Sequence, residues 1–494
     1  MRKKEGFFMN DRTTYIIGVD IGTSSAKTIG LGIGGEVLAS FQQAYSTDHP
    51  QPGYSEQDPA VLLLAVMNGI REVVRKTGFA PAAISFSSAM HSIVALDAKG
   101  TPLTPLIIWA DNRSEAQAMA LRDTPAGKAI YRQTGTPVHA MSPLCKIIWL
   151  REQQPALFAR TAMFPGIKEY IIHHFLGRYL TDHSIASATG LFDISTLQWS
   201  AEALAVAGIH AAQLPQPVPA TEVVTGLKPA IAADLGIPVS TPFVMGGSDG
   251  CLAQLGSQAM DPGHATLTIG TSGAVRMAGS QPLIDAQGRL FTYLLTDDVY
   301  ITGGATNNGG VVLQWLVQDF LQQPLTALQE LVDAALRVDP GKLLCLPYLL
   351  GERSPIWNSH ATAAFIGIQP QHTPAHFTRA VLEAICYALL SIKKALEETA
   401  GPVHKISVSG GFTHSPGWIQ LMADIFGQRM HLQQQSDASA IGAIILAAQT
   451  LGMPPIAGLT DAPEKVFEPD MEKHTSYITS YQRFIWLYER LKED

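Results

Sequence analysis

The stretch Tyr-Ile-Ile-Gly-Val-Asp-Ile-Gly-Thr-Ser-Ser-Ala-Lys, residues 15–27, joins an apolar strand pattern to a sharp glycine turn. Its tetrapeptide Ile-Gly-Thr-Ser returns at residues 269–272, again at the end of an apolar run. Glycine lets the backbone bend tightly and approach a ligand closely. Successive N–H groups and Thr/Ser hydroxyls then converge, which suits phosphate oxygens. The repeat predicts two halves of one clamp around a polyphosphate; the alternative is two ordinary hairpin turns.

The two copies differ at one informative position, because the first carries Asp20 where the second carries Thr268. A single carboxylate beside phosphates is a suitable ligand for Mg²⁺. Asp20 is therefore the expected metal ligand. The predicted phosphate-binding residues are Thr23, Ser24, Ser25 and Lys27 in the first turn and Gly270, Thr271 and Ser272 in the second.

Length and composition indicate a soluble enzyme with two domains. The chain has 494 residues, which is more than one core usually serves. Its net charge is −8, from 34 basic and 42 acidic residues, which argues against nucleic acid or an anionic membrane as partner. The four cysteines are scattered without metal-ligand spacing, as expected of reduced, buried thiols in a cytoplasmic protein.

A coarse division follows from the repeated strand-turn-strand theme. Residues 1–12 are basic but lack the apolar stretch of a secretory signal, so they are interpreted as a leader, with Met9 as an alternative start. An N-terminal domain is expected over residues 13–254, a C-terminal domain over 255–452, and a tail ending in a helix over 453–494. No run of about 18 apolar residues is found, so no membrane-spanning segment is expected.

Phosphoryl transfer also needs a base for the attacking hydroxyl and a holder for the nucleotide. Asp249 follows an apolar strand and two glycines, which places its carboxylate at a strand end with little crowding. The alternative is a helix N-cap before Cys251. Gly410 and Gly411 end another strand before a helix, where the backbone can approach a nucleotide closely. The chain contains no Walker sequence, so this is not the common nucleotide-binding loop.

Polar residues in apolar surroundings indicate the substrate side. The set comprises Met90, His91, Trp109, Arg113, Lys146 and Lys168. Trp and Met commonly serve core packing instead, and Lys146 could extend its ammonium group to the surface. Together the six residues predict a pocket for a polyhydroxy compound, including an acidic one.

These features resemble the FGGY family of carbohydrate kinases, within the actin-like, ribonuclease-H-like ATPase group. The resemblance spans residues 15–491, and two long signatures carry it, at residues 141–153 and 363–383. The segments at residues 86–92, 109–114, 246–250 and 349–357 look most like those of gluconate-phosphorylating members. Members that phosphorylate xylulose also carry the Met-His pair, so Met90 and His91 do not decide between the substrates.

The resemblance implies an α/β fold of two actin-like domains, each with a mixed sheet, around an active-site cleft that closes by rotation of the second domain. Asp249 matches the general base of the family, and Asp20 matches the residue near Mg²⁺. ATP contacts are implied for the two phosphate turns and for Gly310, Gln314, Gly410, Gly411 and Ser415. Met90 and His91 match substrate contacts.

The expected reaction is ATP-dependent phosphorylation of D-gluconate to 6-phospho-D-gluconate. Lys146 and Lys168, with Arg113 as the next choice, are the expected ligands of the substrate carboxylate, a group that neutral sugars lack. Two alternatives stay open: a kinase for xylulose or another sugar or polyol, and a sugar-binding regulator without turnover. The oligomeric state is also open, with a homodimer as one expectation.

Overall fold

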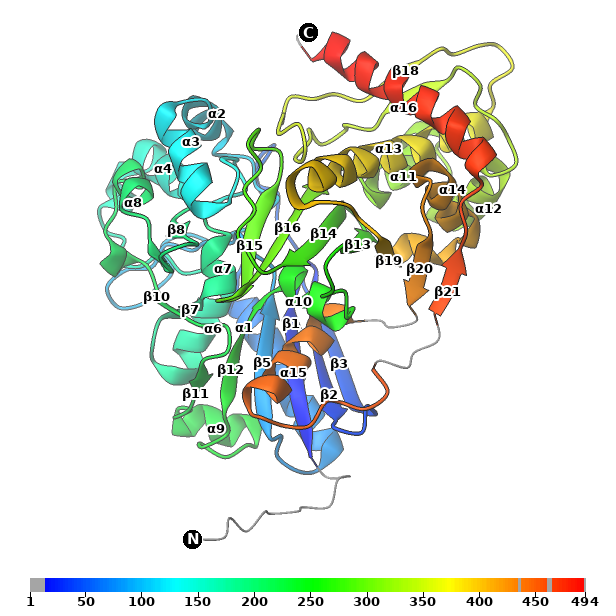
Figure 1. Ribbon diagram of the computed structural model, residues 1–494. Coiled ribbons are helices and arrows are strands. Elements are labelled where there is room, and N and C mark those ends of the chain that lie inside the picture. Colours follow the sequence, from blue (N-terminus) through cyan, green and yellow to red (C-terminus); the bar gives the residue numbers. More distant parts are fainter. Residues whose placement is uncertain (1–13, 434–436, 460–463, 493–494) are drawn as a thin grey trace.

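The computed structural model describes residues 14–433, 437–459 and 464–492. The expected leader, residues 1–12 with Met9, lies outside these ranges. Two mixed sheets with helices packed on their faces form two lobes (Figure 1). The expected two-domain, actin-like α/β fold is confirmed by this architecture and by the solved structures reported below.

The first lobe is built on a six-stranded sheet of order β11-β12-β5-β1-β2-β3. Its strands are β1 (Tyr15–Ile21), β2 (Ser25–Gly32), β3 (Val37–Ala44), β5 (Ala83–Ser88), β11 (Val223–Val224) and β12 (Phe243–Ser248). β1, β2 and β3 form an antiparallel meander, whereas β5 runs parallel to both β1 and β12. The first phosphate turn joins β1 to β2.

The second lobe repeats this plan in a seven-stranded sheet of order β15-β16-β14-β13-β19-β20-β21. Its strands are β13 (His264–Ile269), β14 (Gly273–Gly279), β15 (Phe291–Thr296), β16 (Val299–Thr306), β19 (Lys405–Ser409), β20 (Met430–Gln433) and β21 (Glu464–Phe467). β13, β14 and β16 are the corresponding antiparallel strands, with β15 beyond β16 at the edge, and β19 runs parallel to β13. The second phosphate turn joins β13 to β14, so the two turns occupy equivalent positions in the two sheets.

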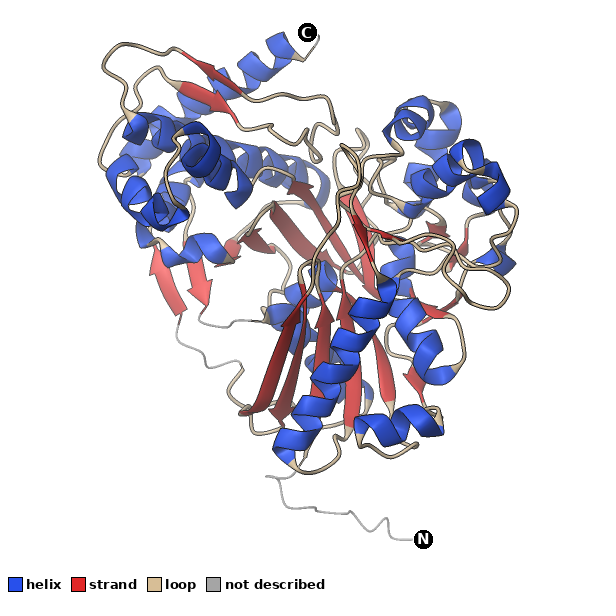
Figure 2. Cartoon of the chain, turned by 180° about the vertical axis from the view of Figure 1, so that it is seen from behind, coloured by secondary structure: helices blue, strands red, loops and turns tan. Residues whose placement is uncertain are grey.

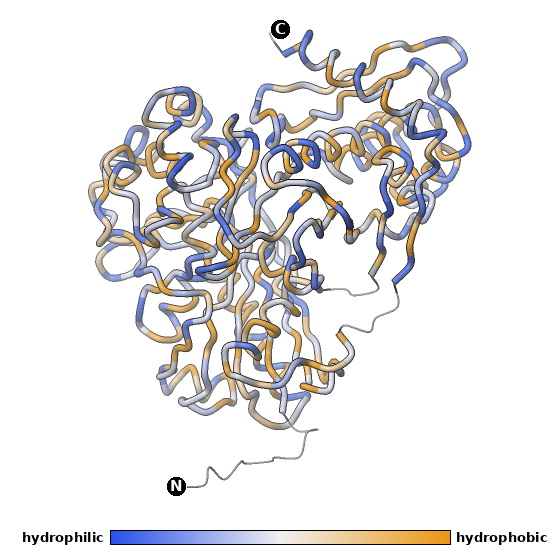
Figure 3. The backbone as a smooth tube through the Cα atoms, viewed as in Figure 1, coloured by the Kyte–Doolittle hydropathy of each residue, from blue (hydrophilic) through white to orange (hydrophobic). Residues whose placement is uncertain are grey.

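Helices cover both faces of the first sheet. α1 (Pro59–Thr77) lies along one face (Figure 2) and begins where the Asp58 side chain accepts a hydrogen bond from the Ala60 N–H. α15 (Ala438–Thr450) covers the other face and is coloured hydrophobic along most of its length (Figure 3). A Cβ on Gly18 of β1 would lie 2.4 Å from the Ala440 carbonyl oxygen, so glycine permits this close contact.

Further helices complete the lobes. The first lobe contains α2 (Glu115–Arg122), α3 (Pro125–Thr134), α4 (Pro143–Gln153), α5 (Pro155–Phe158), α6 (Ile167–Leu176), α7 (His183–Ser187), α8 (Ala201–Ala207), α9 (Pro229–Leu235) and α10 (Asp249–Gly256). The second contains α11 (Gly310–Trp315), α12 (Leu328–Ala335), α13 (Pro374–Ala400), α14 (Pro416–Phe426) and α16 (Met471–Leu491). Short strand pairs join β4 (Glu56–Gln57) to β6 (Leu106–Ile107), β7 (Leu180–Asp182) to β10 (Gln216–Val218), β8 (Phe192–Asp193) to β9 (Gln198–Trp199) and β17 (Leu344–Leu346) to β18 (Ala364–Ile366).

Helix α15 complicates the expected division at residue 255. It belongs to the sequence that follows the second sheet, yet it packs against β1 and β5 of the first sheet. Glycines permit its close packing on α10, because a Cβ on Gly256 would lie 1.9 Å from the Ala438 carbonyl oxygen. The domain boundaries therefore stay predictions, and the chain passes between the lobes more than once (Figure 1).

The apolar segments at residues 93–96 and in helix α13 lie within the protein interior. Residues 93–96 are apolar but form only isolated bridges, such as Ile93 with Ile107. Helix α13 is long and apolar enough by composition to cross a membrane, which the sequence expectation had excluded. However, 83% of its most apolar window is buried inside the protein, as in the core helix of a globular domain. All four cysteines are buried and free, as expected.

Candidate active site

Asp249 stands where β12 ends and α10 begins. Gly246 has a φ of +71°, and a Cβ there would lie 1.8 Å from the Phe86 carbonyl oxygen of β5. The β12–β5 register shifts between Val244 and Gly247, which re-aims the strand end. Ser248 is the residue that precedes the helix, so Asp249 is its first residue and not its N-cap. The Asp249 carboxylate accepts a hydrogen bond of 2.6 Å from the Gly250 N–H.

A cavity of about 180 Å³ lies against Asp249, between the two lobes. Its lining from the first lobe is Thr23, Ala89, Met90, His91, Trp109, Met141 and Asp249, and from the second lobe Ser272, Gly273, Ala274, Arg276, Phe291, Tyr293, Ala305, Arg353 and Trp357. The lining includes one residue of each phosphate turn, Thr23 and Ser272. The cavity therefore connects Asp249 to both turns.

Three acidic residues lie close enough to influence one another in this region. Burial raises the pKa of Asp20 to about 7, and the charges of Asp249 and Asp437 act in the same direction. Burial also raises the pKa of the Asp249 carboxyl, while the positive charge of Arg276 opposes that shift. A raised pKa makes a carboxylate a better proton acceptor at neutral pH.

The first phosphate turn is held by hydrogen bonds from several elements. The Gly22 N–H donates to the Ser25 carbonyl at 3.0 Å and closes the turn. The Tyr45 hydroxyl donates to the Gly22 carbonyl at 2.6 Å, and the Trp109 indole N–H donates to the Thr23 hydroxyl at 2.8 Å. Ser24 at the tip is exposed. These bonds fix the turn and leave its tip accessible to a ligand.

Lys27 of this turn forms an ion pair with Asp437, the residue immediately before α15. Asp437 has a φ of +73°, a left-handed conformation that non-glycine residues rarely adopt. The pair links two residues 410 positions apart in the sequence. Asp437 is a residue of this region that the sequence analysis missed.

The second phosphate turn is tied to the start of α11. The Gly310 N–H donates to the Gly270 carbonyl at 2.8 Å, and the Gly309 N–H donates to the Thr271 carbonyl at 3.2 Å. Gly270, Thr271 and Gln314 are exposed, and a Cβ on Gly270 would meet nothing within 4 Å. The turn and this helix face therefore border open space.

The glycine pair after β19 lies beside the second turn. Gly410 has a φ of +100°, and a Cβ there would lie 2.3 Å from the Ile269 carbonyl oxygen of β13. Gly411 is exposed, and a Cβ on it would meet nothing within 4 Å. Ser415 is buried at the beginning of α14. The structure thus gathers the predicted nucleotide residues around the ends of β13 and β19.

Asp20 is the single predicted metal ligand, and its carboxylate accepts a hydrogen bond of 2.7 Å from the Ser87 hydroxyl. In the described part of the chain, no group of three or more His, Cys, Asp or Glu residues is arranged to hold a metal ion alone. Mg²⁺ commonly takes one or two carboxylates, with phosphate and water oxygens as its other ligands. Asp20 beside the first turn fits such a site.

Three of the predicted substrate residues line the cavity: Met90, His91 and Trp109. His91 has a φ of +69°, and its Nδ1 lies 2.7 Å from the Ala188 carbonyl oxygen. Burial lowers the pKa of His91 to about 3, so the ring is neutral. Its Nδ1 must then carry the proton that reaches Ala188, which leaves Nε2 as an acceptor toward the cavity side.

The other three predicted residues are not part of the cavity lining. Lys146 is fully buried, and its ammonium donates to the carbonyls of His91 at 2.7 Å and Ile108 at 2.8 Å. Burial lowers the pKa of Lys146 to about 7. Arg113 binds Asp111 at 2.7 Å and Glu56 at 2.5 Å. Both side chains are satisfied by the protein itself, and neither lies where it could contact a substrate carboxylate in this cavity.

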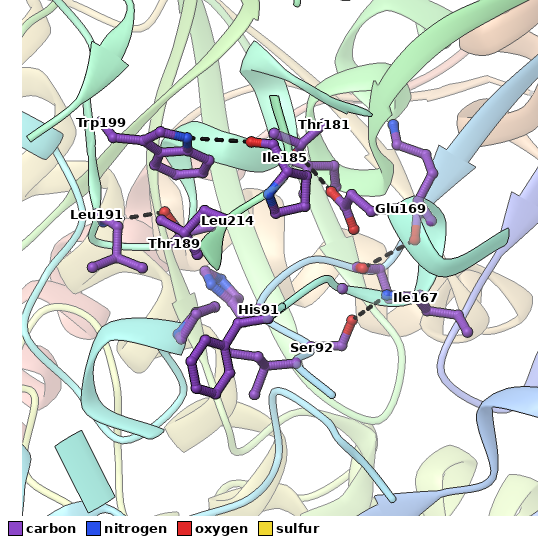
Figure 4. A pocket seen from close by; sticks show the side chains of 18 residues that line it. His91, Ser92, Ile167, Glu169, Thr181, Ile185, Thr189, Leu191, Trp199 and Leu214 are labelled. Atoms are coloured by element: carbon purple, nitrogen blue, oxygen red, sulfur yellow. Dashed lines mark hydrogen bonds between the residues drawn. The ribbon is translucent and has the colours of Figure 1, made fainter. Parts of the chain in front are cut away.

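Lys168 is likewise fully buried and forms an ion pair with Asp182. It lines a separate enclosed space of about 30 Å³ behind His91, which Figure 4 shows with Ser92, Glu169 and Thr181 around it. A space of that size holds about one water molecule. Lys168 is therefore a structural cation, and it does not reach the cavity beside Asp249 where a substrate carboxylate would bind.

Two arginines that the sequence analysis did not select line the cavity instead. Arg276 lies on β14, four positions after Ser272, and Arg353 lies within the segment 349–357. The Arg353 guanidinium stacks on the Trp109 ring at 4.9 Å from its centroid, a contact between the two lobes. In the sequence, the position of Arg276 just after the second turn and that of Arg353 within residues 349–357 could have indicated that they lie near the site.

The sequence matches one family of known proteins over both lobes. The FGGY family of carbohydrate kinases matches over its N-terminal domain at residues 15–256 and over its C-terminal domain at residues 265–451. The chain belongs to the FGGY family of carbohydrate kinases. It is therefore a kinase that acts on a small sugar-like substrate, and members of the family use ATP as phosphate donor.

Individual FGGY relatives fall into two substrate groups. The chain is 39% identical to a gluconokinase from Bacillus licheniformis and 40% to one from Bacillus subtilis (strain 168), covering 89% of this chain and 88% of each relative. It is 30% identical to a xylulose kinase from Staphylococcus epidermidis, with 97% of both chains covered. Two solved structures from Lactobacillus acidophilus, a gluconate kinase and a ligand-bound xylulose kinase, each superpose with a TM-score of 0.90 at 33% identity, covering 97% of this chain and 98% of theirs.

Proposed function

We propose that this FGGY kinase phosphorylates D-gluconate at its 6-hydroxyl, with ATP as donor and Asp249 as general base. The observation that carries the proposal is the position of Asp249 in a cavity lined by both phosphate turns. The preference for a sugar acid is supported by the 39–40% identity to gluconokinases against 30% to a xylulose kinase. The two arginines in the lining also favour an anionic substrate.

In the proposed mechanism, the 6-hydroxyl lies against Asp249, which accepts its proton as the new O–P bond forms. The proton passes from the substrate oxygen to the Asp249 carboxylate, and ADP leaves as the β–γ bridging bond breaks. Met90, His91 and Trp109 position the sugar chain from the first lobe. Because the transition state of phosphoryl transfer is loose, positioning and charge stabilisation contribute more than the base.

The nucleotide would lie across the two phosphate turns. The first turn contributes Thr23, Ser24, Ser25 and Lys27; the second contributes Gly270 and Thr271, with Gly310, Gln314, Gly410, Gly411 and Ser415 around the rest of the molecule. Asp20 would hold Mg²⁺, which supplies charge neutralisation on the phosphates when bound. Lys27 would exchange Asp437 for phosphate oxygens. Rotation of the second lobe would exclude water from the site.

A xylulose kinase is the second candidate. The xylulose kinase from Staphylococcus epidermidis covers more of the chain than the gluconokinases do, and the two solved structures do not separate the substrates. A sugar-binding regulator without turnover is disfavoured, because Asp20, Lys27 and Asp249 are all present. The division into domains at residue 255, the cytoplasmic location and a homodimer stay predictions.

A coupled assay of ADP release tests the proposal. We expect turnover with D-gluconate to exceed that with D-xylulose, other pentuloses, glycerol and neutral hexoses at equal concentration. Phosphate should appear on the 6-oxygen of the product by ³¹P–¹H NMR correlation. Faster turnover with xylulose than with gluconate would show that the protein is a xylulose kinase. No turnover with any sugar or sugar acid would favour a sugar-binding regulator.

A further inference from the structure

The cavity beside Asp249 contains more positive than negative charge. Its ionisable lining consists of the acid Asp249, the arginines Arg276 and Arg353, and His91, which is neutral because burial lowers its pKa to about 3. The remaining ionisable group, the Tyr293 phenol, is also neutral because burial raises its pKa. The lining itself therefore carries one more positive than negative charge, and a further acid, Glu352, acts on Arg353 through its charge without an ion-pair contact among the described residues. A net positive charge in a confined space favours an anion.

Arg353 is only 8% exposed, yet its guanidinium has no carboxylate within ion-pair distance among residues 14–433, 437–459 and 464–492. Its Nη2 donates to the Thr306 carbonyl at 3.2 Å, and its Nε has no hydrogen-bond partner among those residues. Burial lowers the pKa of Arg353, and the charge of the adjacent Glu352 opposes that shift. The Glu352 carboxylate makes no hydrogen bond to the guanidinium, because it accepts bonds from the Thr306 hydroxyl and from the N–H groups of Asn307 and Arg353. A buried donor left unsatisfied is costly, which indicates that a ligand completes it.

Arg276 is given room by two glycines. A Cβ on Gly250 would lie 3.0 Å from its Nε, and a Cβ on Gly303 of the neighbouring strand would lie 3.1 Å from its Cγ. No hydrogen bond or ion pair to its guanidinium is found among the residues that the structure describes. The charge of Arg276 acts on Asp249, yet its guanidinium makes no direct contact with that carboxylate among those residues, so its N–H groups are available to a ligand.

The positions along β14 separate this charge from the phosphate turn. Ala274 and Arg276 both line the cavity, as residues two apart on one strand face should. Ala274 lies near Ser272 of the turn, and Arg276 lies about 7 Å further along the strand. That length is comparable with an extended six-carbon chain. The Arg276 guanidinium itself lies beside Gly250, the neighbour of Asp249, so a six-carbon substrate in this cavity lies within reach of both the base and the arginines.

We propose that Arg276 and Arg353 bind the carboxylate of the sugar acid and so determine the preference over neutral sugars. The inference rests on the proposed function, since a neutral substrate has no group for them. Guanidinium groups bind carboxylates through two parallel charge-assisted hydrogen bonds, so the pair recognises a planar anion and not merely a negative charge. The stacking of Arg353 on Trp109 places this recognition at the contact between the lobes.

The test compares D-gluconate with D-glucitol, which carries a hydroxymethyl group in place of the carboxylate. Affinities are measured by calorimetry without nucleotide, for the wild type, Arg276→Met, Arg353→Met and the surface control Arg71→Met. We expect each cavity variant to bind gluconate about 10- to 150-fold more weakly, while glucitol binding and the KM for MgATP stay as in the wild type. Arg71→Met should match the wild type for all ligands.

Retained gluconate affinity in both cavity variants would overturn the inference, and the proposed function would still stand if the wild type phosphorylates gluconate. A rise in the KM for MgATP without loss of gluconate affinity would also overturn it, because the arginines would then serve phosphates. Arg276 is partly exposed on β14, so we expect Arg276→Met to stay folded. This variant therefore keeps the test decisive if Arg353→Met unfolds. A wild type that phosphorylates no sugar acid would remove both proposals.

Discussion

Buried charges in the interior of the first lobe differ from those around the cavity in how the protein neutralises them. Lys168 is paired with Asp182, and Lys146 donates to two backbone carbonyls. Arg353 is nearly as buried, but in the described part of the chain no carboxylate lies within ion-pair distance of its guanidinium. Charge in apolar surroundings therefore does not by itself mark a binding site. A cation that lines a cavity and lacks an ion-pair partner is the better candidate for binding an anion.

The largest expected effect is on catalysis and comes from Asp249→Asn. Without the proton acceptor, kcat should fall about 10²- to 10⁴-fold, while gluconate affinity changes little. The amide should not reduce stability, because burial raises the pKa of Asp249 and the ionised form is costly to bury. Steady-state kinetics and chemical unfolding measure both effects. Near-normal turnover would reject Asp249 as the base, and Asp234→Asn on the surface serves as control.

The next effect is on stability and comes from Lys168→Met. It leaves Asp182 buried and uncompensated, which typically costs about 3–5 kcal/mol. The folded fraction should keep the wild-type preference among sugars, because Lys168 does not line the cavity. Urea unfolding and the substrate panel measure the two properties.

A second substitution sharpens that result. Asp182 also accepts a hydrogen bond of 2.9 Å from the Ile185 N–H at the start of α7, and asparagine can preserve this cap. Lys168→Met/Asp182→Asn should therefore recover much of the lost stability. A Lys168→Met variant that is stable but loses its preference for gluconate would contradict the structural role of Lys168, because it would then act on the substrate.

A moderate effect is expected from pH through Asp20. Its folded pKa of about 7 lies above the ordinary value of 3.8, so its stabilising contribution is complete below pH 3.8 and is lost as pH rises through about 7. The thermal midpoint of the unliganded wild type should fall relative to that of Asp20→Asn between pH 5 and pH 8. Saturating MgATP should narrow the gap at pH 8. A gap independent of pH would show that burial and the acidic neighbours do not raise the pKa of Asp20.

The smallest expected effect is on stability and comes from Arg71→Met, because Arg71 lies on the surface, outside both the buried interior and the cavity. Arg71 pairs with Asp234 at 2.6 Å, with side chains 40% and 43% exposed. Solvent screens such a pair, so Arg71→Met should cost no more than about 1 kcal/mol. Its kinetics should match the wild type. A larger loss would mean that exposure is a poor guide to the value of an ion pair in this protein.

Local sequence predicted the parts of the site that depend on local backbone chemistry. The two turns, the strands that flank them and Asp249 at a strand end were all placed from adjacent residues. Local sequence could not show pairing, because Lys168 lies in α6 while its partner Asp182 ends the following strand, β7, and the partner of Lys27 lies 410 positions away. For the same reason Arg276 and Arg353 were overlooked, since only the fold reveals which cations the protein leaves unneutralised.

The return of α15 to the first sheet has a consequence for how the protein is made. Emerging from the ribosome, β1, β2, β3, β5 and β12 would have one sheet face covered by α1, while the opposite face would wait for residues 438–450. N-terminal domains generally complete folding first during synthesis. Here the first sheet cannot bury its second face until residues 438–450 have been translated, after most of the strands and helices of the second lobe.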